Sequence, residues 1–249
     1  VIGGGMALAR AELTGPSLSR LRPKLKQTAF ALWGLYIFLT LLEFSLLYFT
    51  GAMDLFDSVN HALTTMPSGG FSTRDGSIGY YDSFLVESIV IVFMFLAGVN
   101  FTLLWFIRDG DFKRAFGDEE FRNYVVYVTV AVLAVFVALI ASGTSAGRAL
   151  RNSMFQVISI GTSTGYTSTD YMDDSWPLVT HLILFILMVV GASAGSTSGG
   201  LKLLRVTLAF KVAMRELVRI AQSRRNSHLL IPSNHYEHIL LMVGRFSSC

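Results

Sequence analysis

The sequence has few charged residues and almost no cysteine. Only 15% of its 249 residues are charged, against about 25% in an ordinary soluble domain. The single cysteine, Cys249, excludes a disulfide framework and a cysteine-based zinc site. No group of carboxylates, histidines or Ser/Lys pairs suits catalysis, so we expect neither an enzyme nor a covalently bound cofactor. The whole sequence is 52% hydrophobic, with a mean hydropathy of +0.53, which indicates an all-α membrane protein.

Long apolar windows support this class. Residues 30–50 contain one charged residue, Glu43. Residues 88–107 and 123–142 contain no charged residue. Each window is about the length of a helix that crosses a hydrocarbon core of roughly 30 Å. A fourth apolar stretch, 176–190, is shorter and is followed by glycines. We therefore expect a multi-pass protein in contact with lipid.

The basic residues gather in short segments between these windows. Of the 20 lysines and arginines, 15 lie in 20–26, in 108–122 and in 202–225, while Arg74, Arg148 and Arg151 fall on the opposite side of the membrane. Lysine and arginine in short loops mark the cytoplasmic side of a membrane protein. The net charge of +3 therefore reflects topology, and we expect no nucleic-acid partner.

One unit of the sequence occurs twice. "MPSGGFSTRD" (66–75) aligns with "GTSTGYTSTD" (161–170), which places Gly165 95 positions after Gly70. The flanks repeat in the same order: a long apolar helix (30–50; 123–142), a shorter segment (54–66; 147–160), the polar loop, and a second apolar helix (83–107; 176 onward). Segments of about 13 residues rise only some 20 Å and cannot cross the bilayer. We expect each to enter the membrane and stop, with the loop buried in protein or facing water.

The loop chemistry suits a dehydrated monovalent cation. Residues 163–166 offer successive backbone carbonyls and hydroxyls, and glycine lets the backbone turn those oxygens toward one axis. One copy alone is more simply a surface turn, but two copies, each between a half-helix and a span, favour a pore. The candidate K+-binding residues are Ser68, Gly69, Gly70, Phe71, Ser163, Thr164, Gly165 and Tyr166.

A third motif, "GASAGSTSGGLKLLR" (191–205), interrupts the last apolar helix. One alternative is a face of small residues for helix packing. A phosphate-binding loop is disfavoured because the GK[ST] ending is absent. We favour an unwound segment that obstructs the pore below the filter and moves aside. Its candidate gating residues are Gly191, Gly195, Ser196, Thr197, Gly199 and Gly200.

Four stretches resemble the ion-conducting subunit of the Trk/Ktr/HKT superfamily of potassium transporters, nearest to the bacterial TrkH type. They are "AELTGPSLSRLRPKLKQTAFALWGLY", "LFDSVNHALTTMPSGGFSTRD", "ISIGTSTGYTSTDY" and "GASAGSTSGGLKLLRV". The resemblance covers roughly residues 1–225. It implies tandem M1-pore helix-filter loop-M2 repeats, of which this chain, as a fragment, carries the second and third of four. It also implies the bacterial cytoplasmic membrane, a homodimer and a cytoplasmic nucleotide-binding RCK regulatory subunit.

This reading divides the chain into four parts. They are the end of a preceding repeat with a linker (1–24), one repeat (25–115), a second repeat with its intramembrane loop 191–200 (116–222), and a cytoplasmic linker with the start of another helix (223–249). We expect potassium uptake through backbone carbonyls. The alternative is a broken-helix secondary transporter, a symporter that couples solute uptake to protons or sodium.

For each of four polar residues in apolar segments, the sequence leaves two possible roles open. Glu43 is a functional candidate or a carboxyl with a polar neighbour. His61 and His181 are more simply hydrogen-bonded packing residues than ligands or pH sensors. Asn100 either bonds between helices or lines the pore.

Overall fold

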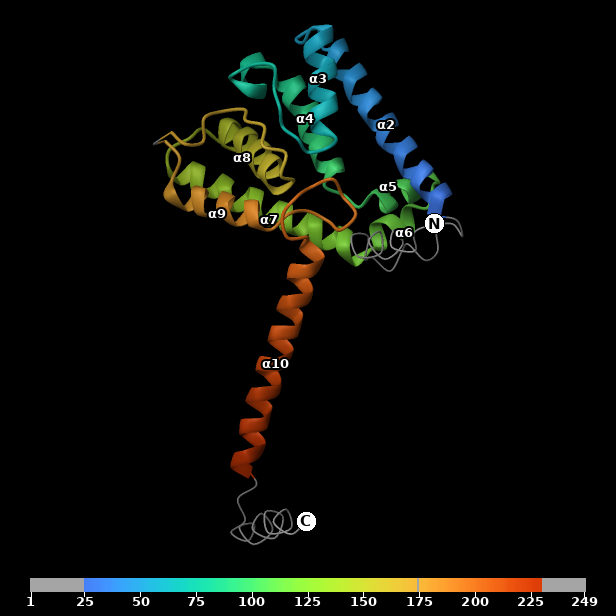
Figure 1. Cartoon of the computed structure of the whole chain (residues 1–249). Helices are drawn as coiled ribbons and strands as arrows, with labels where there is room; N and C mark the ends of the chain where they lie inside the picture. The colour runs from blue at the N-terminus through green and yellow to red at the C-terminus, as the bar shows by residue number, and fades with distance from the viewer. Residues whose placement is uncertain (1–24, 174, 230–249) are drawn as a thin grey trace, which may run out of the picture. The chain divides into compact units, whose positions relative to one another are not determined.

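The computed structural model describes residues 25–173 and 175–229 (Figure 1). The predicted segment 1–24 and the end of the chain from 230 lie outside them. Two compact units divide at Val206 and Thr207, and the described part of the second is the continuation of one helix. The described helices are α2 (Leu25–Phe49), α3 (Leu55–Thr65), the short 3-10 helix η2 (Ser77–Tyr81), α4 (Phe84–Ala97), α5 (Phe101–Arg108), α6 (Phe112–Gly117), α7 (Glu119–Ala141), α8 (Ala146–Gly161), α9 (Leu178–Val189) and α10 (Leu203–Leu229).

Two helices in the described part of the chain are long and apolar enough to cross a membrane by themselves. They are Ala29–Phe49 within α2, with 21 residues, and α7, with 23. At 1.5 Å per residue both exceed about 30 Å. Large apolar side chains on these helices, such as Trp33 and Val130, are exposed, as lipid contact requires. The prediction of an all-α membrane protein is confirmed.

The two short segments form helices that cannot span. α3 has 11 residues and α8 has 16, which corresponds to about 17 Å and 24 Å. The Asp54 side chain caps α3 by accepting a hydrogen bond from the Asp57 amide. Both helices end where the chain enters a polar loop. The repeated order of long helix, half-helix and loop is therefore present in the structure.

The apolar window 88–107 predicts one continuous helix, and here the prediction is wrong. α4 ends at Ala97, α5 begins at Phe101, and the two are bent by 107°. Gly98 lies in this break, packed against the Tyr124 side chain so closely that a methyl group would come within 2.3 Å of the hydroxyl. By length and composition, the bent pair counts as a third, broken span.

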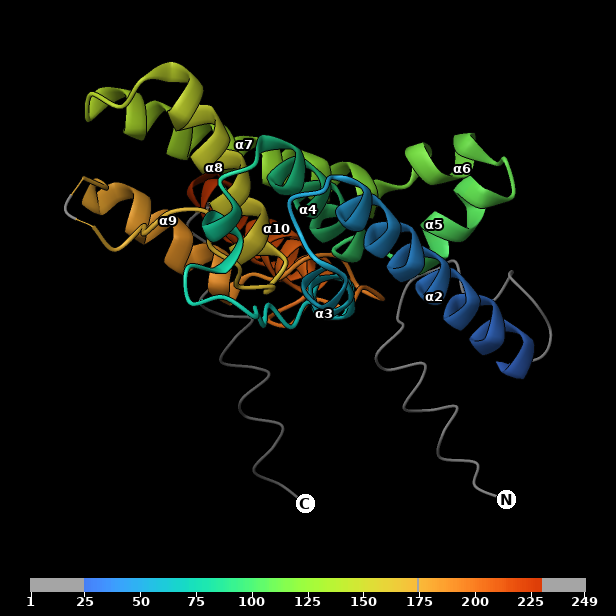
Figure 2. The ribbon, with the colours of Figure 1, turned by 90° about the horizontal axis from the view of Figure 1, so that it is seen from above.

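Helix α7 lies at the centre of the packing in the first unit. One apolar cluster joins it to α2, α4 and α8 through residues such as Val90, Tyr124 and Phe155, and a second joins it to α8 and α9 through Leu184 and Leu187. In both views α2 and α5 lie on one side of this unit and α8 and α9 on the other (Figure 2). The two polar loops meet between them.

Candidate functional site

The first polar loop, residues 66–71, folds back onto the end of α3. Ser68 and Gly70 have left-handed backbone angles, with φ of 57° and 64°. The Ser68 amide donates to the Thr65 carbonyl, while the amides of Gly69 and Gly70 both donate to the Thr64 carbonyl, at 2.8 and 3.1 Å. All three N–H groups are thus directed to the helix end, which leaves the loop carbonyls for other partners.

The second polar loop, residues 161–166, repeats this arrangement 95 positions later. Ser163 and Gly165 have φ of 59° and 89°. The Ser163 amide donates to the Ile160 carbonyl, and the amides of Thr164 and Gly165 both donate to the Ser159 carbonyl, at 2.9 and 3.2 Å. A left-handed serine costs about 1–2 kcal/mol. Its recurrence at both equivalent positions indicates a conformation that the site requires.

A hydroxyl from each half-helix fixes the far end of each loop. Thr64 Oγ1 lies 2.8 Å from the Phe71 carbonyl oxygen, and Ser159 Oγ lies 2.6 Å from the Tyr166 carbonyl oxygen. These two pairs are also related by 95 positions. The duplication seen in the sequence therefore extends to individual hydrogen bonds.

The two loops abut through their backbones. A methyl group built on Gly70 would lie 1.9 Å from the Thr164 carbonyl oxygen, so only a glycine fits there. The carbonyls of 68–70 and 163–165 accept no hydrogen bond from the described part of the chain. Because uncapped backbone oxygens at membrane depth need a partner, these six carbonyls are suited to face water or a cation.

The residues after the two glycines differ in their environment. Tyr166 is fully buried, and its hydroxyl lies 2.6 Å from Thr64 Oγ1 and 3.1 Å from the His61 carbonyl oxygen on α3. Tyr166 thus ties the second loop to the first half-helix. Phe71 has no hydroxyl, and its side chain is 75% exposed.

We expect Tyr166→Phe to destabilise the protein by about 1–2 kcal/mol, since Thr64 loses a buried partner. The measurement is thermal unfolding of the detergent-solubilised protein. Tyr80→Phe removes the same hydroxyl from an exposed residue and should change stability by less than about 0.5 kcal/mol. Equal effects of the two substitutions would contradict the role given to the Tyr166 hydroxyl.

The glycine-rich loop, residues 191–200, is closed at its base. The Gly191 amide donates to the Leu201 carbonyl, and the Leu201 amide donates to the Val189 carbonyl, both at 3.0 Å. A methyl group on Gly191 would lie 2.0 Å from the Gly199 carbonyl oxygen. The segment is therefore a compact loop between α9 and α10. Glycine is required at Gly191, where the start of the loop touches its end.

This loop lies against both polar loops. Ser68 Oγ is 3.0 Å from Thr197 Oγ1, and a methyl group on Gly199 would be 3.6 Å from Ser163 Oγ. The predicted filter residues and the predicted gating residues are therefore brought together in one place, although Ser68 and Gly200 are 132 positions apart in the sequence.

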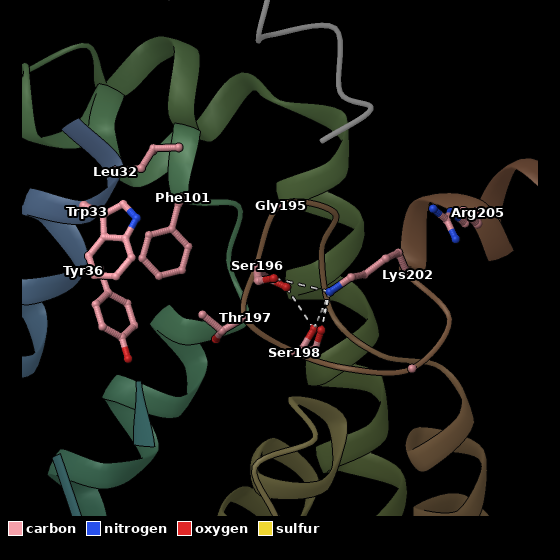
Figure 3. Close-up of a pocket in the computed structure, with 11 residues that line it drawn as sticks. Leu32, Trp33, Tyr36, Phe101, Gly195, Ser196, Thr197, Ser198, Lys202 and Arg205 are labelled. Atoms are coloured by element: carbon pink, nitrogen blue, oxygen red, sulfur yellow. Dashed lines mark hydrogen bonds between the residues drawn. The ribbon is translucent and has the colours of Figure 1, made fainter. Parts of the chain in front are cut away.

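Charged side chains hold the glycine-rich loop from two directions. Glu120, in the first turn of α7, accepts a hydrogen bond from the Ala194 amide. Lys202 donates to the carbonyls of Ser196 and Ser198 (Figure 3). A cavity of about 650 Å³ separates this loop from α2. Trp33, Tyr36 and Phe101 form its aromatic side (Figure 3).

Comparisons with known proteins agree with this geometry. The family model described as TrkH, a cation transport protein, matches residues 2–235. The chain belongs to the TrkH family. This is a family of transport proteins rather than enzymes.

Individual relatives of this TrkH-family chain are potassium uptake proteins. The Trk system potassium uptake protein TrkH of Escherichia coli K12 is 38% identical over 87% of this chain and 45% of its own length. TrkG of the same organism is 33% identical over 89% of this chain. The crystal structure of the potassium transporter TrkH from Vibrio parahaemolyticus matches with a TM-score of 0.77 and 34% identity, over 88% of this chain and 47% of that one. The chain spans about half the length of these relatives.

Asp57, a buried carboxylate on α3, holds the segment that follows the first polar loop in place. Asp57 on α3 accepts hydrogen bonds from Thr73, Arg74 and Tyr81, at 2.6, 2.9 and 2.7 Å. Burial raises the pKa of Asp57, but the hydrogen bonds from Thr73, Tyr81 and Arg74 and the charge of Arg74 outweigh it and lower this pKa overall. The carboxylate thus contributes stability at neutral pH, which is lost as the pH falls through the lowered pKa.

The remaining polar residues of this TrkH-family chain have local roles that the sequence left open. Asn100 caps α5, its Oδ1 accepting from the Thr102 amide at 2.9 Å. The ring nitrogens of His61 and His181 all lie within hydrogen-bond distance of neighbouring oxygens, in agreement with packing. Glu43 is fully buried next to Thr65, and neither carboxyl oxygen has a well-aligned partner among the described residues.

Proposed function

We propose that this chain supplies two of the repeats that line a potassium-uptake pathway across the bacterial cytoplasmic membrane. The observation that carries the proposal is the pair of abutting polar loops, each with its amides directed to a half-helix, in which the carbonyls of 68–70 and 163–165 accept no hydrogen bond from the described part of the chain. Rings of such carbonyls replace the hydration shell of K+. The carbonyl ends of α3 and α8 add a partial negative charge at the same place.

In this proposal the filter oxygens come from Ser68 to Phe71 and from Ser163 to Tyr166. The glycine-rich loop is the gate, because it touches both filter segments from one side and consists of unwound backbone held by exchangeable hydrogen bonds. Such backbone at membrane depth is tolerated where it lines a water-filled cavity.

Assembly follows from the same proposal. A pore needs more than two such loops, so the remaining ones come from elsewhere in the intact protein. The resemblance of the sequence to its superfamily supports a homodimer in lipid and a cytoplasmic nucleotide-binding RCK subunit that acts on the gate. The names of the relatives support other components of a Trk system as partners.

Reconstitution of the intact protein in liposomes tests the proposed function. We expect potassium influx that Gly165→Asp reduces at least about tenfold, because a fixed carboxylate in the filter holds the cation too tightly for it to leave. Gly147→Asp makes the same change in the first turn of α8, where nothing lies within 4 Å, and should leave influx unchanged. Absence of influx, or equal loss in both variants, would overturn the proposal.

A further inference from the structure

The break between α4 and α5 lacks the hydrogen bonds of one helical turn. In a continuous α-helix the Phe101 amide would donate to the Ala97 carbonyl, and the Thr102 amide would donate to the Gly98 carbonyl. Instead, the Phe101 amide donates to the Gly195 carbonyl at 3.2 Å, and the Thr102 amide donates to Asn100 Oδ1 at 2.9 Å. Both amides are thus satisfied from outside the helix ladder.

The two carbonyls of the missing turn are also bonded from outside. The Ala97 carbonyl accepts from the amide and the hydroxyl of Thr197, at 3.2 and 3.1 Å, and the Gly98 carbonyl accepts from the Ser193 amide at 3.1 Å. The glycine-rich loop therefore takes three of these four groups, and the Asn100 side chain takes the fourth.

These groups are in a buried place. Ala97 is fully buried, and Phe101 and Thr102 are 8% and 2% exposed. If the loop moved away and nothing else changed, buried backbone groups would lose their partners, which is strongly disfavoured away from water. The released groups of Phe101 and Ala97 are, however, each other's partners in an unbroken helix.

We propose that the glycine-rich loop and the break at 98–100 form one two-state switch, with Asn100 as its positioning residue. With the loop docked, α4 and α5 are bent and the loop obstructs the pathway. With the loop displaced, Phe101 bonds to Ala97, Thr102 leaves Asn100 for Gly98, and Phe84 to Arg108 becomes one helix.

A continuous helix from 84 to 108 has about 36 Å of length, enough to cross the bilayer. The open state would therefore have a complete span where the closed state has a bent one. This switch rests on the proposed function, because it makes the glycine-rich loop a gate. It goes further by linking gate position to the shape of a helix in the preceding repeat.

The distance between the ends of α4 and α5 tests the switch directly. Spin labels at Leu85→Cys and Arg108→Cys, in an intact protein with Cys249→Ser, mark two exposed positions in these helices. Straightening places them about 35 Å apart, longer by more than about 10 Å than the bent form. Pulsed electron paramagnetic resonance resolves this shift.

The loop is released by substitutions outside α4, α5 and the 98–100 break, although Glu120 also accepts a hydrogen bond from the Asn100 side chain. Glu120→Ala with Lys202→Ala removes both charged clamps, and we expect a new population at the long distance together with raised resting potassium influx. Asp75→Ala with Arg148→Ala removes one exposed charge of each sign elsewhere and should leave the short distance alone.

Substitutions of Asn100 address the same switch from the other side. Asn100→Leu removes the cap and favours a continuous helix, so we expect the long distance and higher influx. Asn100→Ser keeps a capping hydroxyl and should restore the short distance, which a purely structural role of Asn100 would not predict.

Two results separate the switch from the proposed function. A short distance in both the clamp-free variant and Asn100→Leu would overturn the switch, even where Gly165→Asp still blocks influx. If Gly165→Asp did not reduce potassium influx, the proposed filter would be contradicted, whatever the spin-label distances show.

Discussion

Gly70→Ala is expected to abolish potassium influx by the intact protein, with a loss of at least about 100-fold, because filter oxygens must stay aimed at one axis to conduct. The added methyl group would lie 1.9 Å from the Thr164 carbonyl oxygen and 2.8 Å from its carbon. These are backbone atoms, so they cannot turn away as a side chain would. One of the two polar loops must shift, and the carbonyls of both change direction.

The same substitution also opposes the local backbone. Gly70 has a φ of 64°, and a left-handed residue with a side chain costs about 1–2 kcal/mol. Overpacking adds about 1–3 kcal/mol. Influx into liposomes and thermal unfolding measure the two effects, and gel filtration of the detergent complex separates a blocked filter from a misfolded protein.

Gly69→Ala is the matched control in the same loop. A methyl group there meets the Phe71 ring and the Thr64 carbonyl oxygen at 3.5 Å, an ordinary contact, and its φ is not left-handed. We expect a much smaller loss of influx. If Gly70→Ala conducted as well as Gly69→Ala, the close approach of the two loops would be wrong.

The repeated half-helices and loops could be predicted because their signals are local. Length alone shows that residues 54–66 and 147–160 cannot span, and glycine after a run of hydroxyl residues marks where a helix ends. The structure adds that the equivalence reaches the level of the backbone: Ser68 and Ser163 are both left-handed. Nothing in the composition of the loops predicts that a serine adopts a left-handed conformation.

The bend between α4 and α5 could not be predicted, because its cause lies about a hundred residues away. The window 88–107 has no proline and no charge, and Gly98 and Asn100 are its one glycine and its one asparagine. At the bend, the glycine-rich loop bonds to the Phe101 amide and to the Ala97 and Gly98 carbonyls, which an unbroken helix would pair internally. For the same reason the sequence gives no signal for Glu120, since its partner, Ala194, is adjacent only in the fold.

Arg151→Ala is expected to lower the free energy of unfolding by about 3–5 kcal/mol, because it leaves a buried carboxylate without its counter-charge. Arg151 on α8 binds Glu87 on α4 through two nitrogens, with Nε 2.6 Å from Oε2 and Nη2 2.9 Å from Oε1. Glu87 is 3% exposed. Asp82, at 3.5 Å, is 92% exposed and adds little. This pair joins the second half-helix to the preceding repeat.

Two comparisons make this prediction specific. Arg114→Ala breaks an ion pair whose members are 71% and 36% exposed and should cost less than about 1 kcal/mol. Glu87→Leu with Arg151→Leu removes both charges and should recover most of the lost stability, since a buried pair is weakly stabilising relative to apolar residues. Unfolding in mixed detergent micelles gives all three values. A cost for Arg151→Ala no greater than that for Arg114→Ala would show that Glu87 finds water or another partner, and that the two repeats are held together mainly by their apolar contacts.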